Sequence, residues 1–339
     1  MKDKFMVCVR CFTYNHAPFI KETINGFVIQ RTDFPFVCVI VDDDSTDGEQ
    51  DVIKKYLYNH FDVYSTSGNI TEETEDYSLI FARHKENINC FFAVYLLKYN
   101  HWGKKSKMGY ISKYLNGSKY IALCEGDDYW ISENKLQKQV DFMENHADYG
   151  LIHTMFQSYP LKRFGSKVPQ KKEDNYFLEV LSGDYPIGTL TVLYRQSTYK
   201  SLPLLFIGKG FLRGDYPLWI EFAYYSKIKY LHDNTAMYRI LENSASHSKD
   251  ITKELLFYKK AIECKQFYAN EFGINFQVDY KKYYDSCMKS AFKHKNNEIA
   301  KKILKEALQK KCLSKKSLLF YCATRVSLIR FAITLLYKL

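Results

Sequence analysis

Short runs of consecutive apolar residues alternate with amphipathic segments over the first 60 residues. The runs Phe5–Phe12 and Phe36–Val41 are rich in β-branched and aromatic residues and lack polar alternation, which is typical of strands buried on both faces. Pro18 suits the first turn of a helix that is predicted to reach about Gln30, and Glu49–Asn59 is a second predicted helix. The order strand–helix–strand–helix predicts the start of a parallel α/β sheet.

The middle of the chain continues this alternation less regularly. Residues 61–85 are polar and are predicted to be irregular, and Glu86–Tyr99 is predicted to be helical. Lys119–Cys124 is a third buried strand, followed by a helix that Ser132 caps and that runs to about Asn145. Further strands are expected at Tyr149–Phe156, Thr189–Tyr194, Lys229–His232 and Ala236–Ile240, and a further helix at Asp215–Ser226.

The pattern changes near residue 250, after the polar stretch Asn243–Asp250. From about Ile251 no strand-like run remains, and the chain is helical and rich in lysine to its end. We therefore predict an α/β domain at 1–250 and a basic helical region at 251–339.

Composition is that of a folded protein whose positive charge is unevenly spread. With 46% hydrophobic and 26% charged residues, wholesale disorder is excluded. The net charge is +11, but residues 301–339 hold ten basic residues and one acid, so that +2 remains for the other 300 residues. A nucleic-acid-binding domain spreads its charge over the folded body, whereas a basic tail suits an anionic surface.

The last 23 residues, Ser317–Leu339, are mostly apolar. Arg325 and Arg330 lie inside this segment, and each would cost roughly 2.5–3.5 kcal/mol at the centre of a bilayer. Lysines precede it at Lys310, Lys311, Lys315 and Lys316. The pattern favours a helix lying at a membrane interface over a helix packed on protein, with a true span as the third alternative.

Nine cysteines are scattered along the chain, and no secretory signal opens it, which predicts a reducing, cytoplasmic location. Cys8 and Cys11 form a CxxC pair inside the first apolar run. Positions i and i+3 of a strand face opposite ways, so this pair is predicted to be buried and not to chelate an ion.

Two buried strands are each followed by acidic residues, at Asp42–Asp44 and at Glu125–Asp128. Ligands of parallel α/β sheets bind beyond the carboxyl ends of the strands, and carboxylates gathered there repel unless a cation or sugar hydroxyls lie between them. Capping and turn formation are the alternative. They explain the first cluster well and the second less well, because Tyr129-Trp130 separates its acids from the next helix.

The common phosphate-binding loops are missing from the sequence. No GxxxxGK[ST] occurs, and Gly208, Gly210 and Gly214 do not fit GxGxxG. The phosphates of a bound nucleotide would therefore need a divalent metal for neutralisation, and the acidic clusters offer ligands for one.

Six segments in order give the chain a resemblance to family 2 glycosyltransferases over about residues 5–245. The resemblance implies the GT-A fold, a Rossmann-like and mostly parallel sheet flanked by helices, here followed by a C-terminal helical segment. The segments are Thr13-Tyr14-Asn15, Val41–Gly48, Ala122–Trp130, Gly188–Thr191, Arg213-Gly214-Asp215 and Met237-Tyr238-Arg239.

This resemblance implies roles on the donor side of a site. Thr13, Tyr14 and Asn15 are expected to line the base and ribose of a nucleotide, and Asp43 to hydrogen-bond the base, typically uracil. Asp127 is expected to contact the ribose or the donor sugar.

The resemblance also implies a metal ligand, a base and an acceptor side. Asp128 is expected to coordinate Mn²⁺ or Mg²⁺ on the diphosphate, and Asp215 corresponds to the general base of the family. Gly188, Thr189 and Trp219 are expected on the acceptor side. An N-cap remains the alternative for Asp215.

Two positions are less well defined. Lys85, in the stretch His84–Asn87, is a secondary candidate for contact with the base or diphosphate, and a solvated turn is the alternative. Relatives carry a His two residues after the Tyr-Arg pair, where this chain has Leu241; His247 is a candidate replacement or a surface residue.

Together these features predict a metal-dependent, inverting glycosyltransferase that uses a nucleotide sugar, UDP-linked by expectation, and a glycan or lipid-linked glycan acceptor in surface polysaccharide synthesis. A peripheral position on the cytoplasmic face of the inner membrane is expected from the tail, and no nucleic-acid partner is. A non-catalytic nucleotide-sugar-binding protein and a sugar nucleotidyltransferase are the alternatives, and the oligomeric state stays open.

Overall fold

The computed structural model describes residues 5–63, 71–102, 107–160, 164–165, 176–185, 187–212, 215–241 and 250–337. Contacts divide the chain into two compact units. The first comprises Met1–Phe177, Tyr185–Pro203 and Glu221–Ile240, and the second comprises Leu178–Asp184, Leu204–Ile220 and Leu241–Leu339.

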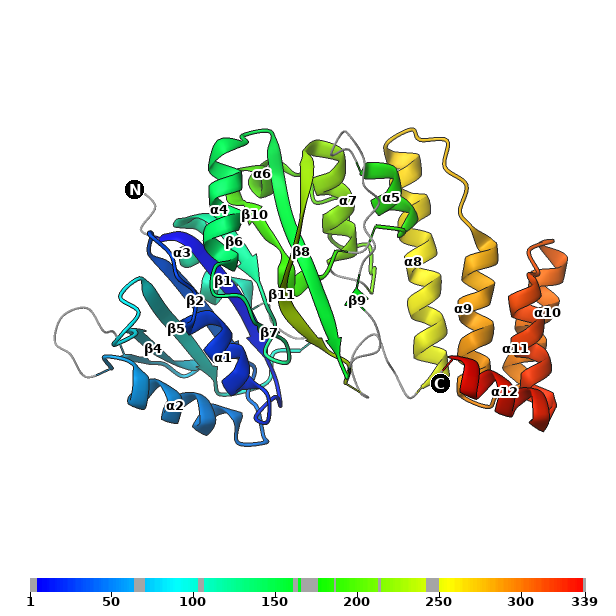
Figure 1. Cartoon of the computed structure of the whole chain (residues 1–339), viewed down its shortest axis with the longest axis horizontal. Helices are drawn as coiled ribbons and strands as arrows, with labels where there is room; N and C mark the ends of the chain where they lie inside the picture. Colours follow the sequence, from blue (N-terminus) through cyan, green and yellow to red (C-terminus); the bar gives the residue numbers. More distant parts are fainter. Residues whose placement is uncertain are drawn as a thin grey trace. The chain divides into compact units, whose positions relative to one another are not determined.

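The first unit is built on one mixed sheet, which has eleven strands within the described residues (Figure 1). The central strands β5, β2, β1 and β6 are mutually parallel, whereas β10 runs antiparallel between β6 and β8. The order across the sheet is β3-β4-β5-β2-β1-β6-β10-β8-β11-β7, with β9 paired to β8. The strands are β1 (Phe5–Thr13), β2 (Phe36–Asp42), β3 (Thr71–Glu73), β4 (Tyr77–Arg83), β5 (Cys90–Leu97), β6 (Ser118–Leu123), β7 (Tyr129–Trp130), β8 (Tyr149–Tyr159), β9 (Phe164–Gly165), β10 (Leu193–Arg195) and β11 (Lys227–Arg239).

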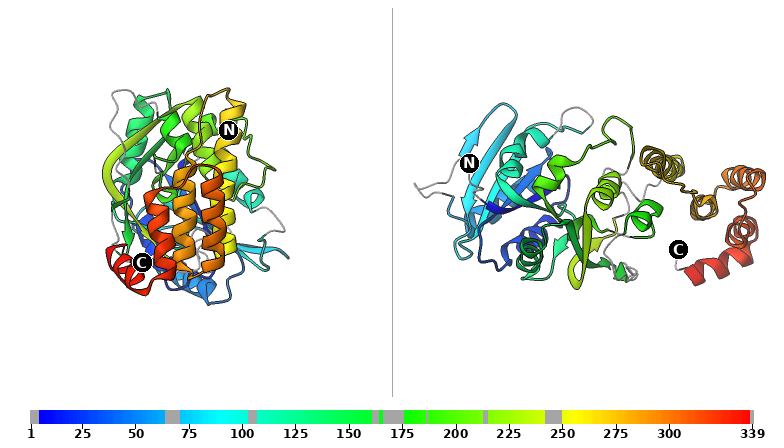
Figure 2. Two further views of the ribbon diagram at one scale, coloured as in Figure 1. Left: turned by 90° about the vertical axis from the view of Figure 1, so that its right-hand side faces the viewer. Right: turned by 90° about the horizontal axis from the view of Figure 1, so that it is seen from above.

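Helices cover both faces of the sheet. The helices α1 (Ile20–Val28), α2 (Glu49–His60) and α4 (Lys135–Asn145) share one apolar core with alternate residues of β1 and β2, whereas α3 (Met108–Asn116) lies on the opposite face (Figure 2). Every residue of β2 is buried, as a strand covered on both faces requires. The predicted α/β architecture is confirmed.

Cys8 and Cys11 are both buried in β1, as predicted. Burial raises the pKa of both thiols, which makes them poor nucleophiles and poor metal ligands. In the described part of the chain, no group of three or more His, Cys, Asp or Glu side chains is arranged to hold a metal ion.

The prediction of a helix at Glu86–Tyr99 is wrong, and so is the prediction that residues 61–85 are irregular, because strands form in both segments. Residues 90–97 form the strand β5, which pairs with β2 on one side and with β4 on the other. Nearly all of β5 is buried, so it shows no polar alternation, and an apolar run of this length fits a helix or a doubly covered strand equally well.

Several smaller predictions also need correction. The helix assigned to a Ser132 cap begins at Lys135, and Asn134 holds its N-cap position. Residues 189–191 form a short 3₁₀ turn, η1, ahead of β10, and the two short strands predicted between 229 and 240 are one strand, β11. Short helices α5 (Phe177–Ser182), α6 (Gln196–Ser201) and α7 (Tyr216–Tyr225) complete this part of the chain.

The C-terminal part of the second unit is helical, as predicted. Side chains of Asp250, Asp279, Asn296 and Ser314 each accept a hydrogen bond from a backbone N–H at the start of α8, α9, α10 and α11. Helices α9, α10 and α11 stand side by side around a small apolar core (Figure 2). The helices are α8 (Ile251–Glu271), α9 (Tyr280–Lys293), α10 (Asn297–Gln309), α11 (Lys315–Arg325) and α12 (Ser327–Tyr337).

The apolar C-terminal segment is not one continuous helix. It divides at Val326 into α11, which buries Phe320 and Ala323 against the neighbouring helices, and α12, which exposes much of its apolar surface. None of the helices among the described residues is long and apolar enough to cross a bilayer.

Candidate functional site

The parallel strands β1, β2 and β6 end at one edge of the sheet, and the loops that follow them are joined there. The backbone N–H of Asp43 donates to the carbonyl oxygen of Thr13 at 3.0 Å. The N–H of Gly126 donates to the carbonyl oxygen of Phe12, also at 3.0 Å. The two acidic clusters of the sequence therefore flank the end of β1, as expected for a ligand site of a parallel sheet.

Gly126 lies so close to the end of β1 that no side chain fits. A Cβ atom at this position would lie 2.0 Å from Oγ1 and 2.5 Å from Cβ of Thr13. The hydroxyl of Thr23 on α1 also contacts this turn. It lies 2.9 Å from the carbonyl oxygen of Gly126 and 2.6 Å from that of Asp128. The glycine thus brings the Asp127–Asp128 turn against Thr13.

A buried carboxylate, Glu49, ties the loop after β1 to the loop after β2. Glu49 accepts hydrogen bonds from the hydroxyl of Thr13, from the N–H of His16 at 2.8 Å and from the hydroxyl of Ser45 at 2.9 Å. Burial raises the pKa of this carboxyl, while the bonds from Thr13 and His16 oppose that rise. Thr13 is therefore oriented by Glu49 and has little exposed surface of its own.

Tyr14 and Asn15 differ in what they present to a ligand. Tyr14 is 43% exposed at the edge of the sheet, so that its ring is available for stacking on a base. Asn15 is fixed between the loops: its N–H donates to the hydroxyl of Ser45 at 2.8 Å, and its side-chain oxygen accepts from the N–H of Thr46 at 2.8 Å. Its φ of 56° lies in the left-handed region that Asn tolerates.

Asp43 is almost fully buried and already paired. Its Oδ2 accepts from Nζ of Lys107 at 2.7 Å, and its Oδ1 accepts from the N–H of His101 at 2.8 Å. The imidazole of His101 is held by the carbonyl oxygen of Tyr99 at 2.8 Å and by the hydroxyl of Tyr110 at 2.9 Å. Asp43 thus anchors the segment after β5. To contact a base directly, its carboxylate would have to accept a further hydrogen bond from the base in addition to those from Lys107 and His101.

Asp127 and Asp128 differ sharply in their surroundings. The Asp127 carboxylate is partly exposed and has no hydrogen-bond partner among the described residues, whereas the Oδ1 of Asp128 accepts from the N–H of Arg239 at 2.8 Å. Burial and, after it, the charge of Asp127 raise the pKa of the Asp128 carboxyl well above its ordinary value. Two adjacent carboxylates, one of them buried, offer oxygen ligands of the kind that a cation could share with a substrate.

Arg239, at the end of β11, lies against the same turn. Its guanidinium donates to the carbonyl oxygen of Asp127 at 2.6 Å and pairs with the carboxylate of Glu22. The guanidinium carbon lies 4.4 Å from the ring centroid of Tyr129 and 4.9 Å from that of Phe19. Burial lowers the pKa of Arg239 to about 10, so the group stays cationic at neutral pH beside the two acids.

The donor set fits a divalent metal shared with a substrate. The turn supplies hard carboxylate oxygens from Asp127 and Asp128, the ligand type that Mg²⁺ and Mn²⁺ prefer. Mg²⁺ is commonly held by one or two carboxylates together with substrate phosphates and water, and only two protein ligands are then needed. Asp127 and Asp128 are therefore the residues of this turn that could hold such an ion.

The segment before β10 borders the same edge of the sheet. The indole N–H of Trp130, which follows the acidic turn, donates to the carbonyl oxygen of Leu190 at 2.7 Å. Gly188 lies against the ring of Phe156, where a Cβ would approach to 2.5 Å, and its carbonyl oxygen accepts from the hydroxyl of Thr191 at 2.7 Å. The structure thus brings Gly188 and Thr189 to the edge that holds Thr13, Asp127 and Asp128.

The predicted base and one acceptor residue belong to the second unit. Asp215 stands at the start of α7, and its carbonyl oxygen accepts from the N–H of Trp219 at 3.0 Å. Trp219 is buried. Their roles remain predictions. Leu241 is half-buried, and His247 lies outside the described residues, as do Arg213 and Gly214.

Lys85 is not part of the site. It follows β4, which runs antiparallel to β5, so that it lies at the amino-terminal edge of the parallel strands. Its Nζ donates to the carbonyl oxygen of Asn59 at 2.9 Å, at the end of α2. The solvated turn, the alternative interpretation of this basic residue, is the one the structure supports.

The site also contains four residues that the sequence did not single out for it: Glu49, His101, Lys107 and Arg239. The first three lie in segments without a recognisable motif. Arg239 belongs to the Tyr-Arg pair of the resemblance, which was the one signal that pointed to it.

A family model described as "Glycosyl transferase family 2" matches residues 9–69, which carry β1, α1, β2 and α2 together with the Thr13 and Asp43 loops. The first part of the chain is thus similar to family 2 glycosyltransferases. The matched segment contains both partners of the Thr13–Glu49 contact, and it contains Asp43 but not its partner Lys107.

Relatives of the chain include uncharacterized proteins of Mycobacterium bovis and Mycobacterium tuberculosis. Each is 26% identical over 239 residues, which cover 70% of this chain and 59% of the relative. Among solved structures, S. aureus TarS 1–349 in complex with UDP-GlcNAc has a TM-score of 0.47 at 16% identity and covers 96% of this chain and 90% of its own. A mannosyltransferase from Pyrobaculum calidifontis, in complex with GDP-Man and Mn²⁺, has a TM-score of 0.49 at 13% identity, with 99% and 88% covered.

Proposed function

We propose that this protein is a metal-dependent, inverting glycosyltransferase that moves a sugar from a nucleoside-diphosphate sugar to an acceptor hydroxyl. The Asp127–Asp128 turn carries the proposal. Asp127 has no hydrogen-bond partner in the described part of the chain, Asp128 is buried, and both lie beside the cationic Arg239 at the sheet edge that the matched family segment shares. This arrangement suits a diphosphate whose charge is met by a divalent ion held at the turn, which Arg239 positions.

The residues at the end of β1 would hold the nucleotide. Tyr14 offers an exposed ring for the base, and the buried Asp43 fixes the loop that faces it. We favour uracil as the base, in keeping with the resemblance. Thr13 and Asn15 keep the loop in one conformation through Glu49 and Thr46, which lowers the entropic cost of binding.

The reaction would proceed by a single displacement at the anomeric carbon. The acceptor oxygen forms a bond to that carbon while the bond to the diphosphate oxygen breaks, and the carboxylate of Asp215 takes the proton of the acceptor hydroxyl. A bound Mn²⁺ or Mg²⁺ would supply Lewis-acid stabilisation of the leaving diphosphate. Asp127 and Asp128 would hold that ion, and Arg239 would position the turn from which they project.

We propose a glycan or lipid-linked glycan as the acceptor, entering beside Gly188 and Thr189. A sugar nucleotidyltransferase is disfavoured, because the residues after β1 form neither a glycine-rich nor a basic phosphate loop. A non-catalytic nucleotide-sugar-binding protein is the remaining alternative, and only turnover separates it from the enzyme.

A donor screen tests the proposal. UDP- and GDP-linked sugars are incubated with the full chain and Mn²⁺ or Mg²⁺, and release of the nucleoside diphosphate is followed with and without a glycan acceptor. We expect release with one donor class, its loss in EDTA, and its loss in Asp127→Asn. Binding of a donor without any release, with or without acceptors, would support the non-catalytic alternative.

A further inference from the structure

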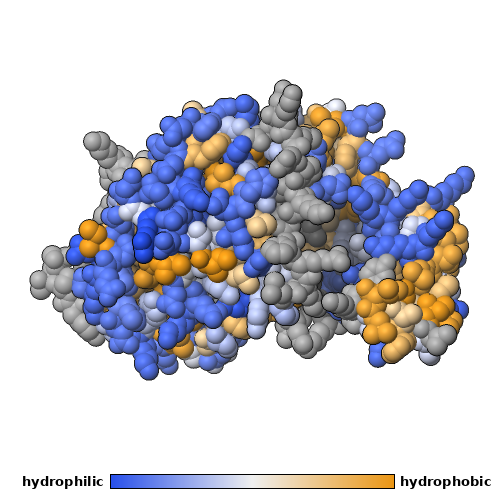
Figure 3. All heavy atoms as spheres, viewed as in Figure 1, coloured by the Kyte–Doolittle hydropathy of each residue, from blue (hydrophilic) through white to orange (hydrophobic). Residues whose placement is uncertain are grey.

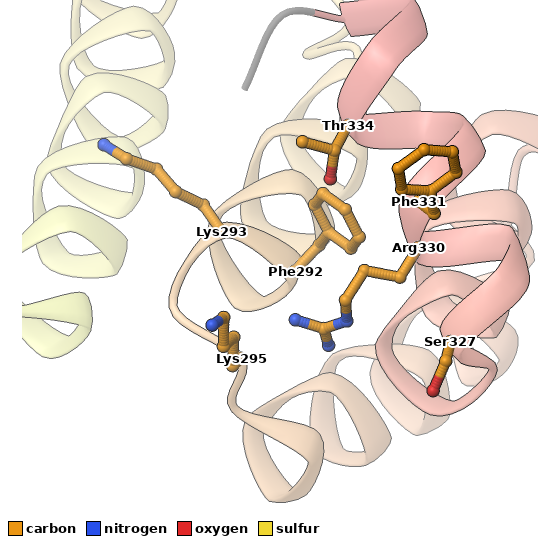
Figure 4. Close-up of a pocket in the computed structure, with 7 residues that line it drawn as sticks. All are labelled: Phe292, Lys293, Lys295, Ser327, Arg330, Phe331 and Thr334. Carbon is orange, nitrogen blue, oxygen red and sulfur yellow. The ribbon is translucent and has the colours of Figure 1, made fainter.

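A basic pocket lies at the junction of α9 and α12, within the second unit (Figure 4). Its volume is about 390 Å³. Three of its lining residues are cationic, two carry hydroxyls and two are phenylalanines, and none of the described residues that line it is acidic. They are Phe292, Lys293, Lys295, Ser327, Arg330, Phe331 and Thr334.

Arg330 is held in the pocket rather than extended into solvent. Its guanidinium carbon lies 5.3 Å from the centroid of the buried Phe292 ring, and Nη2 donates to the carbonyl oxygen of Thr324 at 3.1 Å. Figure 4 shows the guanidinium pointing toward the space between Lys295 and the rings. A fixed guanidinium with flanking lysines and hydroxyls is a chemistry that binds phosphate.

Lys295 occupies a backbone position that a glycine would fill more easily. It follows the end of α9 with a φ of 53°, in the left-handed region that costs an ordinary residue free energy. Its side chain is exposed, so packing does not explain its presence. The next helix ends in the same way, with Lys311 at a φ of 53°, but Lys311 does not line the pocket.

The exposed face of α12 beside the pocket is apolar. Phe331, Leu335 and Leu336 are 66%, 63% and 76% exposed, while Ile333 on the opposite side of the helix is buried. Figure 3 shows apolar side chains gathered over this end of the helical bundle. An apolar helix face bordered by cations is typical of segments that lie in the headgroup region of an anionic bilayer.

We propose that α12 docks on an anionic phospholipid membrane, with a lipid phosphate in the pocket formed by Lys293, Lys295 and Arg330 and with Phe331, Leu335 and Leu336 in the acyl boundary. The positive charge of the last 39 residues complements such a surface. The surface would bring the protein to lipid-linked acceptors, but its binding does not depend on the proposed transferase activity.

Vesicle co-sedimentation of the full chain tests this docking. We expect binding to vesicles with 30% phosphatidylglycerol and little binding to pure phosphatidylcholine. Phe331→Ser with Leu335→Ser should lower the partition coefficient at least tenfold, and Arg330→Gln should lower it several-fold. Donor hydrolysis by these variants should be unchanged, so failure here is distinguishable from failure of the proposed function.

The matched pair Lys295→Gly and Lys311→Gly separates the pocket from general electrostatics. Each change removes one charge and relieves the same backbone strain, so both should raise the melting temperature slightly. Lys295→Gly should weaken vesicle binding by roughly fivefold, and Lys311→Gly should weaken it clearly less, because Lys311 does not line the pocket. If both variants weaken vesicle binding equally, the proposal that the pocket binds a lipid phosphate is overturned.

Two further outcomes would overturn the membrane assignment. If millimolar inorganic phosphate saturates the pocket and the protein does not bind anionic vesicles, the pocket is a site for a soluble anion. A solution dimer that Phe331→Ser dissociates would make the α12 face an interface between two copies.

Discussion

The backbone N–H of Arg239 donates to the carboxylate of Asp128 at 2.8 Å, and thereby fixes a buried acid that lies beside a second one. The bond spans 111 positions of the sequence and joins the end of β11 to the turn after β6. Because Asp128 receives this neutral donor while the Arg239 guanidinium binds the carbonyl oxygen of Asp127, both side chains of the acidic pair keep oxygen atoms for a ligand. The geometry stabilises the turn without neutralising it.

We expect metal binding to compete with protonation of Asp128. Burial and the charge of Asp127 raise the pKa of this carboxyl in the folded protein, so its contribution to stability is fully present at low pH and is lost as pH rises through the raised value. A bound cation removes that loss. Mn²⁺ should therefore raise the melting temperature more at pH 8 than at pH 5.5, as differential scanning fluorimetry would measure.

Asp128→Asn is the matching variant. It keeps an oxygen for the N–H of Arg239 but carries no charge, so the metal-free protein should gain stability at pH 8 and the Mn²⁺ response should vanish. Glycosyl transfer should be lost in the same variant. A full Mn²⁺ response or full activity would remove Asp128 from the metal site.

The contact between Asp43 and Lys107 is expected to be structural as well as functional. Lys107→Met leaves a nearly buried carboxylate with a single backbone donor, and breaking such a pair costs about 3–5 kcal/mol. Asp43→Asn in the Lys107→Met background should restore most of the loss, since no uncompensated charge remains. Urea unfolding of the two single variants and the double variant measures the coupling; additive losses would show that the two groups do not interact.

Much of the fold follows from local patterns, but β5 shows where they fail. The first two strands and the helices α1, α2 and α4 have strong periodicity or apolar runs, and they form close to where the sequence predicts. The strand β5 is an apolar run as well, and only its partners β2 and β4 decide that it is not a helix. The secondary structure of such segments is decided by tertiary contacts, which a local stretch of sequence does not show.

The residues of the site also fall into two groups, those that a local pattern predicts and those that only the fold brings together. Motif residues such as Asp127 and Asp128 were found because their chemistry is visible after a buried strand. Lys107 was not, because its pairing with Asp43 joins positions 64 apart through the fold and leaves no signature around either residue. Lys85 shows the converse, since a basic residue expected before a helix lies after the strand β4, at the amino-terminal edge of the parallel strands.

Gly126→Ala should damage the site by steric means alone. The added methyl would lie 2.0 Å from the Thr13 hydroxyl oxygen and would push apart the turn and the end of β1. We expect a loss of about 1–3 kcal/mol in stability and a weaker affinity for the donor, by calorimetry. Gly109→Ala on α3, where nothing lies within 4 Å of the new Cβ, is the control and should stabilise by up to about 1 kcal/mol. Equal behaviour of the two variants would contradict the close approach.

Lys135 provides a prediction of pH dependence. It is buried beneath the site with its Nζ 4.2 Å from the ring centroid of Trp130, and burial lowers its pKa to about 7. The folded protein therefore binds fewer protons here than the unfolded chain between pH 7 and about 10, and stability should fall by up to about 1.4 kcal/mol per pH unit as pH falls from 10 to 7. Lys135→Met should flatten this slope in urea unfolding, and Lys138→Met, at an exposed ion pair with Asp233, should leave it unchanged.

Asp215 is predicted to act on the acceptor and not on the donor. Asp215→Asn keeps the size and the hydrogen-bonding capacity of the side chain at the start of α7 but removes its ability to take a proton. Affinity for the nucleotide sugar should stay within a few-fold of the wild type, while the transfer rate at saturating acceptor falls by roughly 10²–10⁴, the usual range for loss of a general base. Calorimetry for the donor and a coupled assay for nucleoside diphosphate release give the two numbers. If affinity collapses and the rate at saturating donor survives, Asp215 binds substrate, and the base must be sought at Glu125, whose carboxylate is held by Arg10 at 3.2 Å and by the N–H of Phe12 at 2.9 Å at the same sheet edge.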